Sequence, residues 1–319
     1  MSTSSPLNVT VAAIRPLTPL VREFTFTATD GGLLPRFSAG SHIQVHLPLG
    51  DSGRVLRNAY SLVSDPGDGS HYRIAVRRQE DSRGGSRFLH EQVQPGDRLG
   101  IGAPANLFAP HSRARHHILV AGGIGITPFM AYVQEFERRG DSFELHHACR
   151  TGLTDAYLKH LQQHLGDRFH SYDAEHGKPP RLEQLLHDRP LGTHVYCCGP
   201  QRLIDGVRDT ARQQGWADTR VHFEAFAAPE PGVPFTAHLA RSQRTVQVAS
   251  DQSLLEALEA GGIGVPNLCR GGVCGQCATR FLDGAVEHRD HFLSSEERTH
   301  LLMPCVSRCG SDRPLLLDL

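Results

Sequence analysis

Long apolar runs are absent from this sequence. No stretch approaches the roughly 20 residues that a transmembrane helix needs, and residues 1–10 show no basic region followed by an apolar one. We therefore expect a cytoplasmic protein without a membrane span. The formal net charge is only −1 over 319 residues, which gives no reason to expect nucleic acid or an anionic membrane surface as a partner.

Lysine is also scarce. Only Lys159 and Lys178 occur, so arginine supplies the other positive charges and lysine Schiff-base chemistry is not expected. Histidine is abundant, and two pairs have a spacing that suits a metal ion: His160 with His164, and His288 with His291. No adjacent cysteine or carboxylate completes either pair, so we expect solvated surface residues.

Cysteine is the most informative residue type. Cys269, Cys274 and Cys277 form a C-x4-C-x2-C run, and Cys305 follows after a long gap. This is the spacing of a plant-type [2Fe-2S] site, and it predicts a one-electron carrier. Structural zinc fits less well because zinc ligands usually come in repeated pairs, and disulfides are disfavoured in a cytosolic protein. We expect the remaining cysteines to be mostly small buried residues: Cys149, Cys197, Cys198 and Cys309.

The chain divides into three patterns. Residues 7–110 show short alternating runs separated by turns, which predicts an antiparallel β-barrel. From about residue 116, apolar strands alternate with helical stretches, which predicts a doubly wound parallel sheet. A linker rich in proline and glycine precedes a small α+β, ferredoxin-like (β-grasp) domain. The predicted domains are 1–110, 111–228 and 229–319. The predicted strands of the parallel sheet are 117–121, 143–149, 168–172, 194–198 and 220–224.

Two glycine-containing turns follow strands of the predicted parallel sheet. The first runs from Gly122 to Pro128 and is not a true G-x-G-x-x-G, but its bare amides suit a pyrophosphate. We expect Thr127 to cap the helix that follows, with Pro128 at the first helical position. The second turn is Tyr196 to Pro200. Two such turns at the carboxyl edge of one sheet would flank a ligand crevice.

Two segments of the predicted barrel have residue types that suit a flat ring and a phosphate. Residues 57–62, Arg-Asn-Ala-Tyr-Ser-Leu, place an aromatic ring beside a hydroxyl, which can pack on a flat ring and bond to its edge. Residues 83–87, Arg-Gly-Gly-Ser-Arg, offer amides, a hydroxyl and positive charge to a phosphate. An ordinary barrel strand and a solvated turn explain the same residues.

Taken together, these segments resemble the phthalate dioxygenase reductase family over nearly the whole chain. Residues 58–62 and 83–90 look most similar to carnitine monooxygenase reductases. The resemblance implies an FMN-binding barrel, an NADH domain and a [2Fe-2S] domain, in that order. The NADH-binding residues that it implies are Gly123, Thr127, Cys198, Gly199 and Pro200. The cluster ligands that it implies are Cys269, Cys274, Cys277 and Cys305. For FMN it implies Arg57, Asn58, Ala59, Tyr60, Ser61, Ala75, Val76, Arg77, Gly84, Gly85, Ser86 and Phe226.

Within these sets, the resemblance places Tyr60 and Ser61 at the reactive edge of the flavin and Cys198 beside the nicotinamide. One position departs from the family pattern, Arg-x-Tyr-Ser, because Asn58 stands two residues before Tyr60 and the arginine is one place earlier, at Arg57. In a regular strand Arg57 then points to the opposite face. A bulge would restore its reach, or Arg77, Arg83 or Arg87 would supply the charge.

The resulting hypothesis is hydride transfer from NADH to FMN, followed by single-electron transfer through the cluster to a separate Rieske-type oxygenase. One alternative is a reductase that carries FAD and serves a diiron hydroxylase or a cytochrome. Another is a non-enzymatic redox sensor. NADPH would require arginines at the 2′-phosphate, for which Arg150 and Arg181 are candidates, whereas the resemblance implies NADH.

Overall fold

The computed structural model describes residues 6–48, 55–80, 83–173, 176–177, 179–226, 231–310 and 313–319. They form two compact units. One unit holds the described residues up to Phe226 except Val55 and Leu56, and the other holds those two residues and everything from residue 231 onward. No helix in the described ranges has the length and apolar character needed to cross a membrane.

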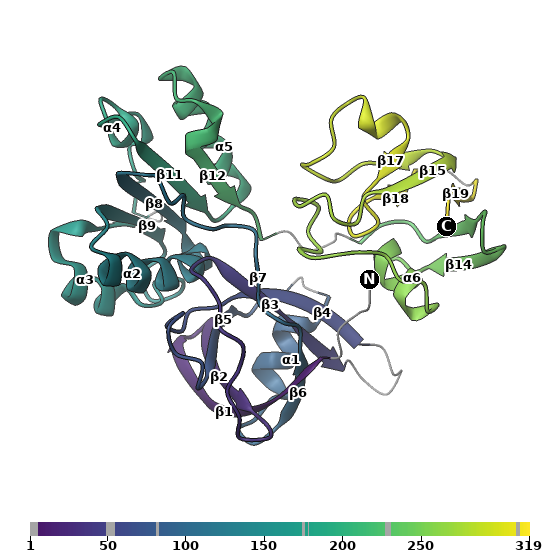
Figure 1. The fold of residues 1–319 in the computed structure, drawn as a ribbon, viewed down its shortest axis with the longest axis horizontal. Coiled ribbons are helices and arrows are strands. Elements are labelled where there is room, and N and C mark those ends of the chain that lie inside the picture. The colour runs from purple at the N-terminus through teal and green to yellow at the C-terminus, as the bar shows by residue number, and fades with distance from the viewer. Residues whose placement is uncertain are drawn as a thin grey trace. The chain divides into compact units, whose positions relative to one another are not determined.

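The first part of the larger unit is an antiparallel barrel (Figure 1). Its strand order is β4-β3-β6-β1-β2-β5, and β7 pairs with β3. A bridge between Leu62 and Ile74 joins the two ends of this order, which closes the ring. Alternating side chains such as Phe24 and Phe26 are fully buried inside it, as the period-two pattern predicts. The elements are β1 (Leu7–Thr18), β2 (Val21–Ala28), β3 (Ser41–Pro48), β4 (Val55–Ser61), β5 (Tyr72–Arg77), α1 (Gly85–Glu91), β6 (Arg98–Ile101) and β7 (Ala105–Asn106).

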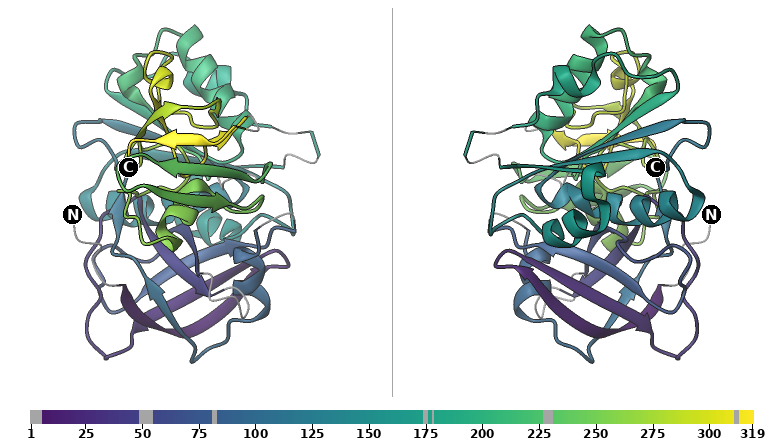
Figure 2. Two further views of the ribbon diagram at one scale, coloured as in Figure 1. Left: turned by 90° about the vertical axis from the view of Figure 1, so that its right-hand side faces the viewer. Right: turned by 90° about the vertical axis from the view of Figure 1, so that its left-hand side faces the viewer.

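The second part of the larger unit is a parallel sheet of order β10-β9-β8-β11-β12 (Figures 1 and 2). Helices α2 and α3 bury Phe129, Phe136 and Leu161 on one face, while α4 and α5 bury Leu186 and Ile204 on the other. The doubly wound prediction is therefore confirmed. The elements are β8 (His116–Gly122), α2 (Thr127–Arg139), β9 (Phe143–Cys149), α3 (Leu158–Leu165), β10 (Phe169–Asp173), α4 (Leu182–Leu186), β11 (Thr193–Cys198), α5 (Gln201–Gln213) and β12 (Val221–Glu224), with 3-10 turns at Gly123–Ile126, Gly166–Arg168 and Asp218–Arg220.

Two local predictions in this sheet were wrong. Thr127 is not a capping residue, because its backbone is already helical and its hydroxyl donates to the Ile124 carbonyl at 2.9 Å. A short 3-10 turn comes directly before Thr127, so backbone groups of this turn lead into helix α2 where a capping side chain was expected. Arg168 and Arg220, expected to begin strands, each end a 3-10 turn immediately before a strand.

The smaller unit is a mixed sheet of order β14-β13-β19-β15-β17 packed against one helix, and a separate pair joins β16 with β18. Helix α6 starts at a capping box, in which Ser253 and Glu256 cap each other through a reciprocal pair of hydrogen bonds. Its buried Leu254 and Leu258 contribute to the core of this unit. The elements are β13 (Phe235–Leu239), β14 (Arg244–Val248), α6 (Leu254–Ala260), β15 (Thr279–Asp283), β16 (Val286–Glu287), a 3-10 turn (Glu297–Thr299), β17 (Leu301–Leu302), β18 (Arg308–Cys309) and β19 (Leu315–Leu317).

The two glycine turns meet at the carboxyl edge of the parallel sheet. Strands β8 and β11 are neighbours, with Ala121 opposite Cys198. A Cβ atom on Gly125 would lie 2.1 Å from the Cys198 carbonyl oxygen, and one on Gly199 would lie 2.8 Å from Gly122 Cα. Only glycine permits this approach of backbone to backbone.

Replacing Gly125 with alanine should lower the free energy of unfolding by about 1–3 kcal/mol, because the added methyl group forces the two turns apart. Gly264→Ala is the matched control, since nothing lies within 4 Å of its added Cβ. Urea unfolding followed by circular dichroism measures both. Equal stabilities of the two variants would contradict the close approach.

Candidate cofactor sites

The four predicted cluster cysteines come together in the smaller unit. The sulfur atoms of Cys277 and Cys305 are 3.3 Å apart, and both residues are buried. Cys269 and Cys274 interact with each other, and the Gly271 amide donates to the Cys269 sulfur at 3.4 Å. The Cys274 thiol, helped by the amides of the loop, lowers the pKa of Cys269 to about 5. Such a set of sulfurs and amide donors fits a [2Fe-2S] cluster, whose ligands are thiolates.

The backbone of this loop requires glycine at two positions. Gly272 and Gly275 have φ angles of 75° and 74°. A Cβ atom on Gly275 would lie 2.3 Å from the ring of Phe292, and one on Gly272 would lie 2.8 Å from a methyl group of Val306. The glycines that the sequence places between the cysteines therefore serve both the left-handed backbone and the close packing around it.

Arg270 also has a positive φ, 54°, although it is not glycine. Its guanidinium is buried and makes two hydrogen bonds of 2.8 and 2.7 Å to the carboxylate of Glu259, at the end of α6. It donates a further bond to Asn267 at 3.1 Å. This bidentate pair offsets the backbone strain and anchors the cluster loop to the helix.

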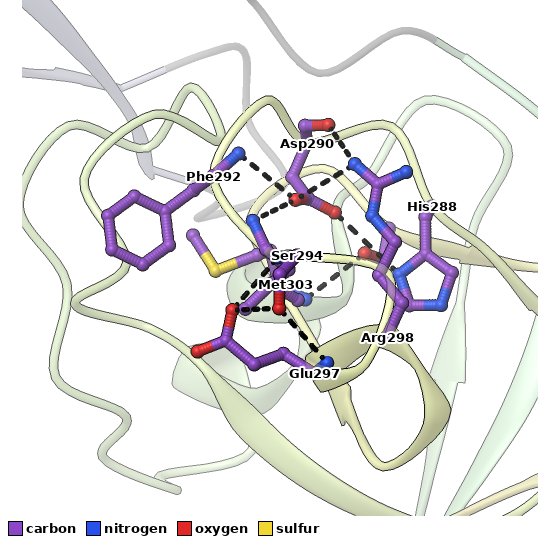
Figure 3. Close-up of polar contacts among 9 residues, drawn as sticks. His288, Asp290, Phe292, Ser294, Glu297, Arg298 and Met303 are labelled. Carbon is purple, nitrogen blue, oxygen red and sulfur yellow. Dashed lines mark hydrogen bonds and ion pairs between the residues drawn. The ribbon is translucent and has the colours of Figure 1, made fainter.

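A buried carboxylate supports the other side of the loop. Asp290 accepts from the amides of Phe292 and Leu293 at 3.2 and 2.8 Å, and Arg298 lies 3.3 Å away (Figure 3). Burial raises the pKa of Asp290. The two amides and Arg298 lower the pKa by more than burial raises it, so the pKa of Asp290 lies below its usual range. The amide of the next residue, His291, donates to the Gly272 carbonyl at 3.0 Å, which ties this segment to the cluster loop.

Of the histidine pairs, His160, His164 and His291 are exposed, as predicted. His288 is not a solvated surface residue, because only 15% of its side chain is exposed and its Nδ1 lies 3.6 Å from Asp290 (Figure 3). The sequence alone did not indicate that the neighbouring carboxylate would be buried. The four cysteines outside the cluster are all buried, as expected.

The predicted nucleotide residues lie on the two turns that follow β8 and β11 and on the start of α2. Thr127 and Cys198 are buried there, and burial raises the pKa of the Cys198 thiol well above its ordinary value. Sequence reasoning missed His147, whose Nε2 lies 3.0 Å from the Gly123 carbonyl and supports the first turn. Burial lowers the pKa of His147 to about 4, so the imidazole is neutral near pH 7.

The predicted flavin residues other than Phe226 lie on β4, on β5 and at the start of α1, whereas Phe226 follows β12. Asn58 donates to the Tyr60 hydroxyl at 3.2 Å, which places both on one face of β4, and burial raises the pKa of Tyr60 to about 12. Gly84 has a φ of 97° before α1, and the Ser86 hydroxyl accepts from the Gln79 amide at 3.2 Å. The roles of these residues, and of Arg57, Ala59, Ser61, Ala75, Val76, Gly85 and the exposed Phe226, remain predictions.

An unsatisfied guanidinium lies in this region. The Nε atom of Arg77 is buried and has no hydrogen-bond partner among the residues that the structure describes, and burial followed by repulsion from Arg150 lowers the pKa of Arg77. An anionic group near the two arginines would supply the missing acceptor and relieve the repulsion. The site therefore fits a phosphate-bearing cofactor.

A second missed feature joins the barrel to the parallel sheet. Glu23 of β2 is buried, and the Tyr157 hydroxyl donates to its carboxylate at 2.7 Å. Thr18 adds a 2.7 Å bond to the Leu153 carbonyl. The same loop brings Ala156 against Ala75, one of the predicted flavin residues. Glu23 therefore positions the nucleotide sheet against the flavin strand.

A groove of about 1030 Å³ lies between the barrel and helices α2 and α3. Its walls include Thr18, Arg73, Met130 and Tyr157, but none of the predicted flavin or nucleotide residues.

Comparison with known proteins assigns the chain to a family. Residues 237–310 match the family described as "2Fe-2S iron-sulfur cluster binding domain", and residues 104–221 match the N-terminal domain of "Dimethylamine monooxygenase subunit DmmA-like" proteins. A solved structure of phthalate dioxygenase reductase superposes with a TM-score of 0.89 at 34% identity, covering 98% of each chain. The chain belongs to the phthalate dioxygenase reductase family.

Relatives of this reductase family extend the likeness over the whole chain. The carnitine monooxygenase reductase subunit of Escherichia coli is 44% identical and covers 100% of both chains. The heme-dependent oxidative N-demethylase beta subunit of Ectopseudomonas mendocina is 61% identical over 317 residues, which are 99% of this chain and 100% of that protein. The chain is thus an oxidoreductase, the reductase component of an oxygenase system, built from a flavin barrel, a parallel nucleotide sheet and a [2Fe-2S] domain.

In this reductase, Asp290→Ala should remove the acceptor of two buried amides and the partner of Arg298, at a cost of about 2–3 kcal/mol. We expect several-fold faster loss of the cluster under a chelator, followed by visible absorbance. Glu296→Gln, a change at an exposed neighbouring carboxylate, is the control. Equal loss rates in the two variants would show that Asp290 does not support the loop.

Tyr157→Phe should remove the hydroxyl that reaches Glu23 while keeping the ring, at a cost of about 1.5–3 kcal/mol for a hydrogen bond to a charged group. We expect a lower melting temperature and slower flavin reduction by NADH in stopped-flow experiments. Arg15→Gln also removes a Glu23 contact, but the Arg15 side chain is 59% exposed, so its effect should be small. An unchanged rate in Tyr157→Phe would contradict the positioning role of the contact.

Proposed function

We propose that this chain passes electrons from NADH through FMN and a [2Fe-2S] cluster to a separate oxygenase that oxidises N-methyl groups. The observation that carries the proposal is the convergence of the four cysteine sulfurs in a chain that also folds a barrel and a parallel nucleotide sheet. When bound, the flavin accepts electrons as a pair from the nicotinamide and releases them singly to the cluster. The protein supplies the positions of these groups.

We assign the flavin ring to Tyr60, Ser61, Ala75 and Val76 on β4 and β5, and its phosphate to the 84–86 turn, with Phe226 over the ring face. Arg77 supports this assignment, because its buried Nε lacks an acceptor. Asn58 bonds to Tyr60 and orients its ring, which makes it a positioning residue. Arg57 lies on the opposite face of a regular strand, so we assign the phosphate charge to Arg77 in its place.

We assign the nicotinamide to the crevice of Gly123, Thr127, Cys198, Gly199 and Pro200. The buried Cys198 thiol stays protonated near pH 7, since its pKa is raised, so it contacts the ring as a small neutral group. The glycines of the two turns let their backbones approach closely, which brings the assigned residues together. NADH is the expected donor. We propose that Arg150 and Arg77 bind the same anionic group and that Arg150 does not bind the 2′-phosphate of NADPH.

The acceptor is the finer part of the proposal. The 61% identical relative is named as a subunit of a heme-dependent oxidative N-demethylase, and the family matched by residues 104–221 is named for dimethylamine monooxygenase. Both names concern oxidation of methylated amines, so we propose an amine-oxidising oxygenase as partner. A Rieske-type oxygenase, which the family resemblance implies, is the second candidate. A cytoplasmic location remains a prediction.

The test uses Cys277→Ser in the full chain. NADH should still reduce ferricyanide through the flavin at a rate within about twofold of the unaltered protein, while electron delivery to the oxygenase should fall by at least about tenfold, because the exit carrier is lost. Cys309→Ser, a buried cysteine outside the cluster set, is the control. Failure of the unaltered protein to reduce ferricyanide with NADH would refute the reductase assignment.

Two further measurements separate the finer claims. Flavin released by denaturation should run as FMN, and FAD would contradict the flavin assignment. A reconstituted assay should show faster electron transfer to a heme-dependent N-demethylase subunit than to a Rieske oxygenase, and the reverse order would favour the second candidate.

A further inference from the structure

Three side chains with metal-binding atoms meet on the parallel sheet, and none of them belongs to the predicted cofactor residues. Strands β9 and β10 are parallel neighbours in which His146 pairs with His170. Glu144 precedes His146 by two residues and shares its face of β9. One ligand atom from each of Glu144, His146 and His170 lies within 4.8 Å of the others. None of the three has a role in the reductase chemistry assigned above.

His146 is prepared as a metal ligand. The residue is only 6% exposed. Its Nδ1 lies 2.9 Å from the Tyr172 hydroxyl, a contact that fixes the ring orientation. Histidine ligands to metals usually bond through their other ring nitrogen in this way.

The opposite nitrogen of the ring faces the carboxylate of Glu144. Nε2 of His146 lies 3.2 Å from Oε1 of Glu144, and both atoms are buried. A divalent cation that displaces the proton shared by an imidazole and a carboxylate would contact both atoms.

The donor set suits zinc. Two imidazoles and one carboxylate suit Zn²⁺, whereas Mg²⁺ and Ca²⁺ prefer oxygen ligands.

Two neighbours determine how tightly an ion would bind. Arg189 Nη2 lies 2.6 Å from Glu144 Oε1 and already balances its charge, so it competes with the ion. The His170 ring is parallel to that of His146, with centroids 4.7 Å apart and an angle of 18°. His170 is exposed, so its ring can turn to direct a nitrogen at an ion held by the other two residues.

We propose that Glu144, His146 and His170 form a binding site for one Zn²⁺ ion, with water completing its coordination. The ion ties β10, the edge strand of the sheet, to its neighbour β9. Tyr172 is a positioning residue that holds the His146 ring. The site is separate from the cluster cysteines and does not depend on the proposed function.

The test is calorimetric titration of ZnCl₂ into the full chain with its flavin and cluster loaded. We expect one strong equivalent, a higher melting temperature, and an unchanged visible spectrum of the cluster, which shows that zinc has not replaced iron. The double variant His146→Asn, His170→Gln should lose the strong equivalent. The matched control is His160→Gln, His164→Gln, an exposed pair whose rings also stack, with centroids 5.7 Å apart, and it should keep that equivalent.

Loss of the strong equivalent in the control pair, or its survival in the site variant, would overturn the proposal. Tyr172→Phe keeps the ring and the strand, so it tests the site without disturbing the fold. Loss of this outer contact should weaken zinc binding by about tenfold. Wild-type affinity in Tyr172→Phe would overturn the positioning role of Tyr172.

Discussion

The close approach of one backbone segment to another is the constraint on which both cofactor regions depend. In the smaller unit, the cluster loop turns through left-handed conformations so that its amides face the cysteine sulfurs. In the larger unit, Gly125 and Gly199 allow the ends of β8 and β11 to touch. A single methyl group would separate the segments in either place. Electron transfer needs cofactors held at fixed positions, and these contacts provide the rigidity.

Each close approach is supported by a buried polar side chain. Arg270 holds the cluster loop to Glu259, and Asp290 holds the segment that covers Gly272 and Gly275. In the larger unit, His147 supports the first nucleotide turn and Glu23 joins the barrel to the sheet. Buried polar groups are costly unless every partner is present. These four side chains therefore link the stability of each unit to the geometry of its cofactor site.

Much of the fold was predictable because the patterns are strong and local. The alternation of Phe24 and Phe26, the apolar run of β8, and the Ser253–Glu256 capping pair each involve residues close in sequence. Helix starts were harder. Thr127 has the right residue type for a cap, but a 3-10 turn occupies the preceding residues, which no local pattern indicated. The prediction that His288 is exposed was wrong because His288 lies beside the buried Asp290. The burial of Asp290 depends on packing from distant residues, which the local sequence does not show.

The sequence by itself predicted the four cluster cysteines and the order of the three folds. Cysteine spacing of C-x4-C-x2-C leaves few alternatives, and a change from period-two to strand–helix patterns marks a change of architecture. Only the tertiary structure decided which polar side chains support these sites. Glu23 and Tyr157 are 134 residues apart, and His146 meets His170 only because β9 and β10 pair in parallel. Such contacts depend on strand order and register, which no short stretch of sequence encodes.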